Sequence, residues 1–268
     1  MTYVMIAVPV QYPAGEWLHR FLEQVDQFPV ETVSRIVFSY GEPRQPLPQG
    51  DPTLVKLKQW KATTKHRVEV VREPKLQALS SAQIAAIYQD FQSMFRSDES
   101  HVLLLDADVV KMPSDLISKL ANQDKDIIAP YVWMRNHVPP LFYDSHVFRY
   151  KGYRFYPIDP PNPKKTFELD SAGTCLLVKR EVFKASPYDN PYPHMRFCRE
   201  SKEKGFKVWA DPNTVIEHLD ITRLGIFHAP IEQMLGQKPD LTSFIDSKDN
   251  VIDPQQFVAK LVSFYVDS

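Results

Sequence analysis

The sequence predicts an α/β protein in which helices cover both faces of a mostly parallel sheet. Strand patterns alternate with helix patterns over the first 133 residues, as in chains built from βαβ units. Residues 101–105 (His-Val-Leu-Leu-Leu) form a continuous apolar run, which is typical of a strand buried on both sides. The chain has 268 residues, 43% of them apolar, and a formal net charge of −1. It can therefore build a large core, and it lacks the basic balance of a general nucleic-acid binder.

The first half of the chain supplies most of the expected elements. Helical spacing of apolar residues predicts three helices, and short β-rich or apolar runs predict five strands between and around them. Ser80 or Ser81 is the expected N-cap of the second helix. In chain order these are a strand at 3–10, a helix at 16–27, a strand at 35–40, a polar proline-rich loop at 41–51, a strand at 67–71, a helix at 80–95, a strand at 101–105, a helix at 113–121 and a strand at 126–133.

The pattern changes after residue 133. Prolines cluster between 139 and 193, and residues 134–166 carry few helix or strand signals, which predicts a long ordered loop region. Beyond it we expect a strand pair or a strand-turn-strand at 167–179, helices at 180–185 and 195–204 (the second closed by Gly205), short strands at 206–210 and 215–218, and a helix near 254–264. We assign residues 1–225 to the α/β domain and residues 226–268 to a C-terminal helical extension.

Composition excludes several functional classes. The closest two of the eight glycines are Gly41 and Gly50, so a dinucleotide fingerprint, a P-loop and a hydrolase nucleophile elbow are all impossible. Cys175 and Cys198 form neither a metal pair nor a redox pair, and we expect buried reduced thiols. No segment approaches the length of a membrane span, and the N-terminus reads as a strand and not as a signal peptide. We expect a cytoplasmic protein.

Asp106 and Asp108 are the most informative pair of residues. They follow an apolar strand directly, and ligands of open α/β sheets bind outside the carboxyl ends of the strands. Two carboxylates one residue apart repel each other unless a cation or several donors lie between them. Hard oxygen ligands in this arrangement suit Mg²⁺ or Mn²⁺, which in turn holds a diphosphate. The alternative is that Asp108 caps the helix expected at residue 113.

At this point the chain resembles the GT-A glycosyltransferases over roughly residues 3–220. The resemblance rests on a first strand ending at Val8-Pro9, a second ending at Ser39-Tyr-Gly-Glu42, the Asp-x-Asp pair, and a late helix, Gly-aromatic turn and strand that end at His218. The segments 106–117, 128–133 and 168–174 are most similar to the fungal mannan-building mannosyltransferases. The resemblance implies a metal-dependent glycosyltransferase of the EC 2.4 class that uses a nucleotide-diphosphate sugar as donor, with Mn²⁺ or Mg²⁺ as cofactor.

The resemblance also implies roles for single residues. Asp106, Asp108 and His218 would bind the metal, and Asp106 alternatively the ribose. Pro9, Ser39, Glu42 and Gln83 would contact the nucleotide or its diphosphate; Ser171 and Gly173 would close over the sugar; and Trp133, Arg135 and Asn136 would face the acceptor. Each has a structural alternative: a hydrogen-bonded histidine at a strand end, ordinary turn residues, a solvated helix residue, or a buried tryptophan beneath the long loop.

The sequence departs from the family at the start of the late helix. Inverting members usually carry an acid there as general base, whereas this chain has Pro193-His194-Met-Arg-Phe-Cys198. Either His194 is the base, or the enzyme retains anomeric configuration with Asp170 stabilising the cationic sugar. We expect retention.

Two other functions remain open. One is a nucleotidyltransferase, although Val8-Pro-Val-Gln-Tyr-Pro13 lacks the basic, glycine-rich phosphate loop of that class. The other is a non-catalytic sugar- or nucleotide-binding domain. The acceptor can be a glycan, a lipid, a protein, a small molecule or a modified nucleobase.

Overall fold

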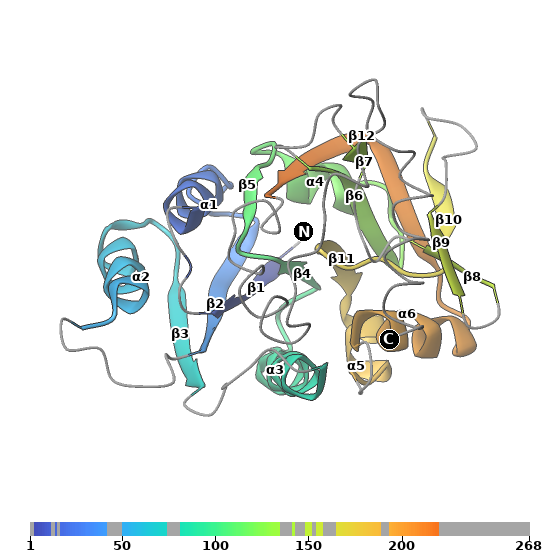
Figure 1. Cartoon of the computed structure of the whole chain (residues 1–268), viewed down its shortest axis with the longest axis horizontal. Coiled ribbons are helices and arrows are strands. Elements are labelled where there is room, and N and C mark those ends of the chain that lie inside the picture. The colour runs from blue at the N-terminus through green and yellow to red at the C-terminus, as the bar shows by residue number, and fades with distance from the viewer. Residues whose placement is uncertain are drawn as a thin grey trace, which may run out of the picture. The chain divides into compact units, whose positions relative to one another are not determined.

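A ten-stranded mixed sheet forms the centre of the computed structural model (Figure 1). The structure describes residues 3–11, 14, 17–41, 50–73, 81–134, 141–142, 148–151, 154–157, 165–188 and 193–219. Its strands are β1 (Val4–Gln11), β2 (Val33–Gly41), β3 (Val68–Glu73), β4 (His101–Leu105), β5 (Val109–Lys111), β6 (Ile127–Met134), β7 (Leu141–Phe142), β10 (Phe167–Leu169), β11 (Cys175–Lys179) and β12 (Val208–His218). The strand order is β10-β12-β6-β11-β4-β1-β2-β3, with β5 beside β12 and β7 beside β6. Strands β8 (Phe148–Lys151) and β9 (Arg154–Pro157) pair with each other.

Six strands share one direction. β1 is parallel to β2 and β4, β2 is parallel to β3, and β6 is parallel to β12. β11 is antiparallel to both β4 and β6, so these two neighbours of β11 are parallel to each other. The carboxyl ends of β1, β2, β3, β4, β6 and β12 therefore meet at one edge of the sheet, and β11 begins at that same edge.

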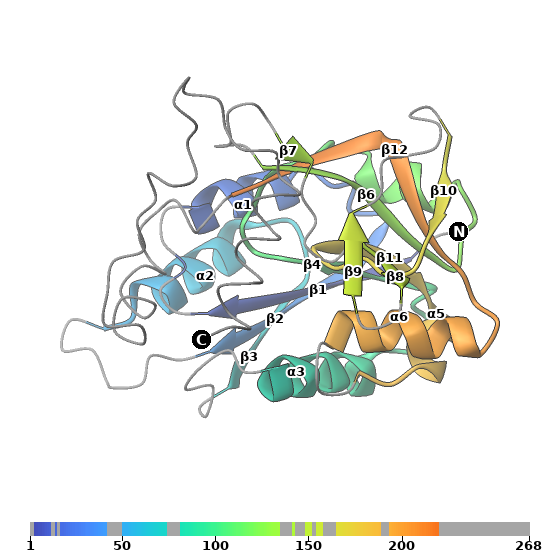
Figure 2. The same cartoon turned by 45° about the vertical axis from the view of Figure 1, so that its right-hand side comes forward.

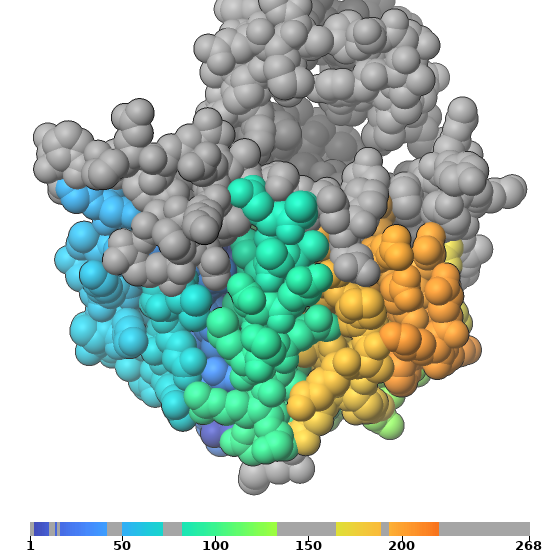
Figure 3. All heavy atoms as spheres, turned by 90° about the horizontal axis from the view of Figure 1, so that it is seen from below, coloured from blue at the N-terminus to red at the C-terminus, as the bar shows by residue number. Residues whose placement is uncertain are grey.

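Helices cover both faces of the sheet, as the sequence predicts (Figures 1 and 2). The helices are α1 (Trp17–Val25), α2 (Pro52–Thr63), α3 (Ser81–Met94), α4 (Leu116–Ala121), α5 (Arg180–Ala185) and α6 (Pro193–Glu203). Because side chains of a strand alternate between faces, Val4 and Ile6 of β1 pack with α1, α2 and α4, whereas Met5 and Ala7 pack with α3, α5 and α6. Figure 3 views the second face, where the surface of α3 meets that of α5 and α6.

Several elements differ from the sequence prediction. Strands β5, β7, β8 and β9 lie where we predicted no strand, and β10 and β11 pair with β12 and with β4 and β6, respectively, instead of with each other. Helix α2 lies in a region for which we predicted no element; Asp51 caps it by accepting hydrogen bonds from the backbone N–H groups of Thr53 and Leu54. The two short strands predicted at 206–210 and 215–218 form one long strand, β12, whose pairing with β6 is irregular between Asp211 and Val215. The helix predicted near 254–264 and the extension at 226–268 lie outside the described residues, so the domain assignment stays a prediction.

Both cysteines are buried and neither forms a disulfide, as expected. No helix in the described part of the chain has the length and apolar character needed to cross a membrane. The cytoplasmic location stays a prediction.

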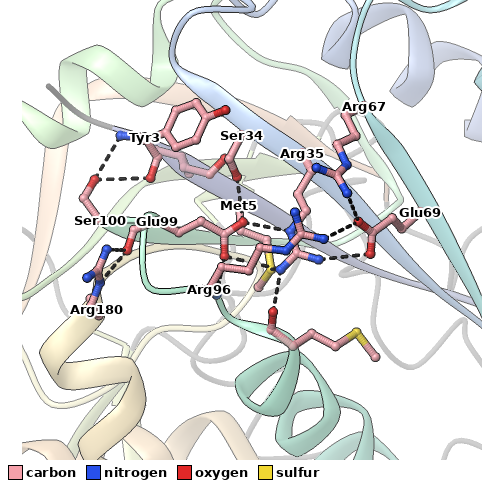
Figure 4. A network of polar contacts seen from close by, with 12 residues as sticks. Tyr3, Met5, Ser34, Arg35, Arg67, Glu69, Arg96, Glu99, Ser100 and Arg180 are labelled. Carbon is pink, nitrogen blue, oxygen red and sulfur yellow. Dashed lines mark hydrogen bonds and ion pairs between the residues drawn. The ribbon is translucent and has the colours of Figure 1, made fainter.

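A buried ion pair holds the opposite, amino-terminal edge of the sheet together (Figure 4). Arg35 of β2 and Glu99, which precedes β4, are 2% and 0% exposed, and Arg35 Nε lies 2.8 Å from Glu99 Oε1. Arg35 also binds Glu69 of β3 and the carbonyl oxygen of Met94 at the end of α3. The network therefore ties two parallel strands, the end of α3 and the start of β4 to one buried guanidinium.

Candidate functional site

Asp106, Asp108 and His218 come together at the carboxyl edge of the sheet. Each offers one ligand atom, and these three atoms lie within 4.8 Å of one another. His218 Nε2 lies 2.9 Å from Asp108 Oδ1, with the His218 side chain 10% exposed and that of Asp108 16% exposed. Within the described residues this is the one group of three or more acidic, histidine or cysteine side chains that is close enough to hold a metal ion. The structure thus brings together the three residues that the sequence assigns to the metal.

Strand pairing accounts for this geometry. Asp106 directly follows β4, and its backbone N–H donates to the carbonyl oxygen of Thr174, 3.0 Å away, just before β11. Asp108 precedes β5, which pairs antiparallel with the end of β12 and sets His218 opposite Val109. The N–H of Leu219 then donates to the carbonyl oxygen of Asp108 at 3.1 Å. The β5–β12 ladder and the hydrogen bond of Leu219 thus place the histidine next to the second aspartate.

The donor set fits a divalent cation. Two partly buried carboxylates supply the hard oxygen ligands that Mg²⁺ and Mn²⁺ prefer, and the imidazole of His218 adds one nitrogen ligand. A carboxylate pair at this edge also raises the pKa of a neighbour: burial, and then the negative charges of Asp106 and Asp108, hold the pKa of Tyr88 well above its ordinary value.

The segment that precedes β11 lies beside Asp106. Ser171 and Gly173 are buried there, and the bond from Asp106 to Thr174 joins the two segments. Asp170 forms an ion pair with Lys202 of α6, and Lys202 Nζ also donates to the carbonyl oxygen of Leu169 at 3.2 Å. The predicted sugar-side residues are thus next to the predicted metal ligands, while the carboxylate of Asp170 is held by a lysine.

Other residues assigned from the sequence have mixed positions. Pro9 and Ser39 face each other in the β1–β2 ladder near the carboxyl edge, and Ser39 Oγ is buried with no hydrogen-bond partner among the described residues. Gln83 is half-buried in the first turn of α3. The backbone of Trp133, in β6, pairs with Glu217 and Phe142. Glu42, Arg135 and Asn136 lie outside the described residues.

His194 lies in an aromatic cluster between α3 and α6. It is 8% exposed, and its ring meets the ring of Tyr88 edge-on, with centroids 4.5 Å apart. Tyr88 in turn stacks on Tyr188 at 4.7 Å. Tyr88 thus contacts both His194 and Tyr188, and the sequence analysis did not single it out. Its only signal in the sequence is its place on the apolar face of the helix at 80–95, which predicts a core residue.

The strand order, with an antiparallel β11 inserted beside β4 and an acidic pair at the carboxyl edge, defines an α/β fold of the GT-A type. Comparison with solved structures supports this. The crystal structure of GalNAc-T7 with UDP, GalNAc and Mn²⁺ matches 82% of the chain at 14% identity and a TM-score of 0.61, over 44% of its own length. The structure of residues 1–349 of TarS from S. aureus matches 82% of the chain at 10% identity and a TM-score of 0.53, over 60% of its own length. The chain thus spans less than two thirds of either structure.

Further comparisons add one family match. Residues 58–150 match the model of the Anp1 family, a segment that contains Asp106 and Asp108. No curated protein has a matching sequence. A 4-diphosphocytidyl-2C-methyl-D-erythritol synthase from Anaerococcus prevotii matches 82% of the chain and 88% of its own length at 11% identity. Its TM-score of 0.46 is too low to support a functional comparison.

Proposed function

We propose that this protein is a metal-dependent glycosyltransferase that moves a sugar from a nucleotide-diphosphate sugar to an acceptor hydroxyl, with retention of configuration. The observation that carries the proposal is the grouping of Asp106, Asp108 and His218 within 4.8 Å at the carboxyl edge of a GT-A sheet. The match of the Asp106–Asp108 segment to the Anp1 model, a mannosyltransferase family, supports the same class of enzyme and favours mannose as the sugar.

The residues at this edge would bind different parts of the donor substrate. Asp106, Asp108 and His218 would hold Mn²⁺ or Mg²⁺, whose positive charge would stabilise the departing nucleoside diphosphate. Ser39 offers a buried hydroxyl beside Pro9 for the nucleoside. Ser171 and Gly173 lie next to Asp106, where the donor sugar would follow the diphosphate. Positioning of the acceptor hydroxyl against the donor sugar supplies the remaining rate acceleration.

The GalNAc-T7 structure provides chemical support for this choice of ligands. It contains UDP, GalNAc and Mn²⁺ on a fold of the same type. We infer that a nucleoside diphosphate and a divalent cation bind together here as well, because a diphosphate would supply oxygen ligands in addition to the three side chains that would hold the cation.

A thermal-shift screen tests the proposal. Nucleoside-diphosphate sugars, GDP-mannose and UDP-GalNAc among them, are added with and without Mn²⁺, because a ligand that binds the native state raises the melting temperature by mass action. We expect one nucleotide to stabilise the protein only when Mn²⁺ is present, and the corresponding sugar nucleotide to be hydrolysed slowly in the absence of acceptor. Release of pyrophosphate from a nucleoside triphosphate would instead indicate a nucleotidyltransferase, and binding without turnover a non-catalytic domain.

A further inference from the structure

The pairing of strand β12 with β6 is irregular between residues 211 and 215, before β12 reaches the proposed metal site. Asp211 pairs with Pro130 of β6 and Val215 pairs with the next residue, Tyr131. The three residues Pro212, Asn213 and Thr214 thus have no counterpart on β6 and form a bulge. Proline suits such a position, because it has no N–H group to contribute to a ladder.

The carboxylate of Asp211 closes this bulge. Asp211 and Thr214 are each 2% exposed. Asp211 Oδ1 accepts hydrogen bonds from the backbone N–H and the Nδ2 of Asn213, at 3.0 and 3.2 Å, and Asp211 Oδ2 accepts one from Thr214 Oγ1 at 2.7 Å. A buried carboxylate is costly unless donors satisfy it, and here the donors come from the bulge itself.

The size of the bulge determines where the end of β12 points. A register slip of one residue moves every side chain of a strand to the opposite face. After the bulge, Ile216 lies opposite Val132 in the same core cluster, as Trp209 lies against Ile128 before it. His218 follows two residues after Ile216 and pairs in the same register with Met134 of β6; on its other side, across a further register shift between Glu217 and His218, it pairs with Val109, next to Asp108. A bulge one residue longer or shorter would turn His218 away from Asp108.

We propose that Asp211 is a positioning residue: by binding Asn213 and Thr214 it fixes the three-residue bulge, and the bulge sets the register that places His218 beside Asp108. The inference rests on the proposed function and deepens it, because the position of one metal ligand, His218, would depend on a side chain that precedes the bulge, Asp211. The placement itself does not require a metal, so it can be measured separately.

The test compares four variants by amide hydrogen exchange and by Mn²⁺ titration of the protein alone. Asp211→Ala removes the acceptor, and Thr214→Val removes one donor with little change of shape, which keeps the test valid if the first variant does not fold. Thr214→Ser restores the donor. Asp126→Ala is the matched control: Asp126 Oδ2 accepts from the N–H of Lys207 at 3.0 Å, at the other end of the same strand pair.

We expect Asp211→Ala and Thr214→Val to lose exchange protection at residues 215–219, including the Leu219 amide bonded to Asp108, and to bind Mn²⁺ about tenfold more weakly. Thr214→Ser and Asp126→Ala should keep wild-type values for both. Unchanged protection at 215–219 in the first two variants, or an equal loss in Asp126→Ala, would overturn the inference. If the wild-type protein binds no Mn²⁺ but the exchange pattern appears, the proposed metal site fails and the positioning role stands.

Discussion

Asp108 is the single residue on which the proposed chemistry depends most, because its carboxylate contacts His218 and follows Asp106 by two positions. Asp108→Asn keeps the size of the side chain and removes its charge. We expect Mn²⁺-dependent sugar transfer to fall by about 100-fold or more, with a melting temperature close to that of the wild type. Initial rates with and without EDTA measure the effect.

Asp115→Asn is the matched control for that experiment. Asp115 is a 53% exposed carboxylate that pairs with Lys119 on the surface, and exposed pairs contribute little to stability. Its replacement should leave transfer unchanged. Full activity in Asp108→Asn, or equal wild-type activity in EDTA, would remove the basis of the proposed function.

His218 should affect metal and nucleotide binding together. His218→Ala removes a nitrogen ligand, so we expect the affinity for Mn²⁺ to fall at least about tenfold. The affinity for a nucleoside diphosphate in the presence of Mn²⁺ should fall with it, while the weak metal-free affinity stays constant. Calorimetric titration with and without Mn²⁺ separates the two. His19→Ala, at a 65% exposed side chain paired with Glu23, is the control; an unchanged metal-dependent affinity in His218→Ala would make His218 a structural residue.

Stereochemistry tests the roles of Asp170 and His194. Asp170 is paired with Lys202, and His194 is packed against Tyr88. We predict retention, in which the leaving diphosphate accepts the proton of the acceptor and Asp170 stabilises the cationic sugar. Proton NMR of the first product from an α-linked donor should therefore show an α linkage. A β-linked product would contradict retention, and His194→Ala should then stop the reaction.

At the scale of elements, clear sequence patterns predicted most of the strands and helices. The buried run at 101–105 became β4 with the predicted bounds, and 180–185 became α5. Asp106 and His218 both stand at strand ends on the carboxyl edge, where ligands of such sheets bind, but the assignment of His218 to the metal rests on the resemblance to the GT-A glycosyltransferases, because strand order alone does not make these two ends neighbours.

Other features could not be read from the sequence. Helix α2 packs mainly through Leu57 and lacks an apolar stripe, so only Asp51 and Pro52 signalled its start. The break at 211–214 was visible, but turn residues alone do not tell a loop between strands from a bulge within one. The contact of His194 with Tyr88 joins α6 to α3, two helices far apart in the sequence. The pattern of apolar residues in one helix does not tell which other helix packs against it.

The ion-pair network around Arg35 at the amino-terminal edge of the sheet joins four elements, β2, β3, α3 and the start of β4 (Figure 4). Glu99→Gln would leave the buried charge of Arg35 without its main partner. Breaking a buried ion pair costs about 3–5 kcal/mol, and we expect a loss of that size in the free energy of unfolding, measured with urea. Glu23→Gln, at a 58% exposed residue, should change it little; a loss below about 1 kcal/mol in Glu99→Gln would contradict the prediction.

The whole molecule should lose stability as the pH falls below neutrality. Burial, and then the charge of Lys65, hold the pKa of His66 below its ordinary value, and burial with Lys179 does the same for His101. In the unfolded chain both histidines bind protons near their ordinary pKa of 6.5. The unfolded state therefore binds more protons below that pH, and the free energy of unfolding falls as the pH decreases.

Urea unfolding at about pH 8 and about pH 5.5 measures this decrease. His101→Gln should make the dependence on pH shallower, whereas His19→Gln, at an exposed position, should leave it unchanged. An equally steep dependence in His101→Gln would show that other groups cause it.

Burial alone would raise the pKa of Glu99, but its hydrogen bonds from Arg35, Arg96 and Ser34 outweigh this and keep that pKa low. Its contribution is therefore lost only in more acidic solution, as the pH falls through that lowered pKa.

The pairing of β5 with β12 also has a consequence for the newly made chain. Lys111 and Glu217, which form an ion pair across this ladder, are 106 positions apart in the sequence. Contacts between such distant segments form late, because a long loop must close first. During synthesis the two aspartates therefore leave the ribosome well before the strand that carries their histidine. The proposed ligand set is complete only after β12 has been translated and has added to the sheet, so a truncated or stalled chain holds the acidic pair without its third ligand.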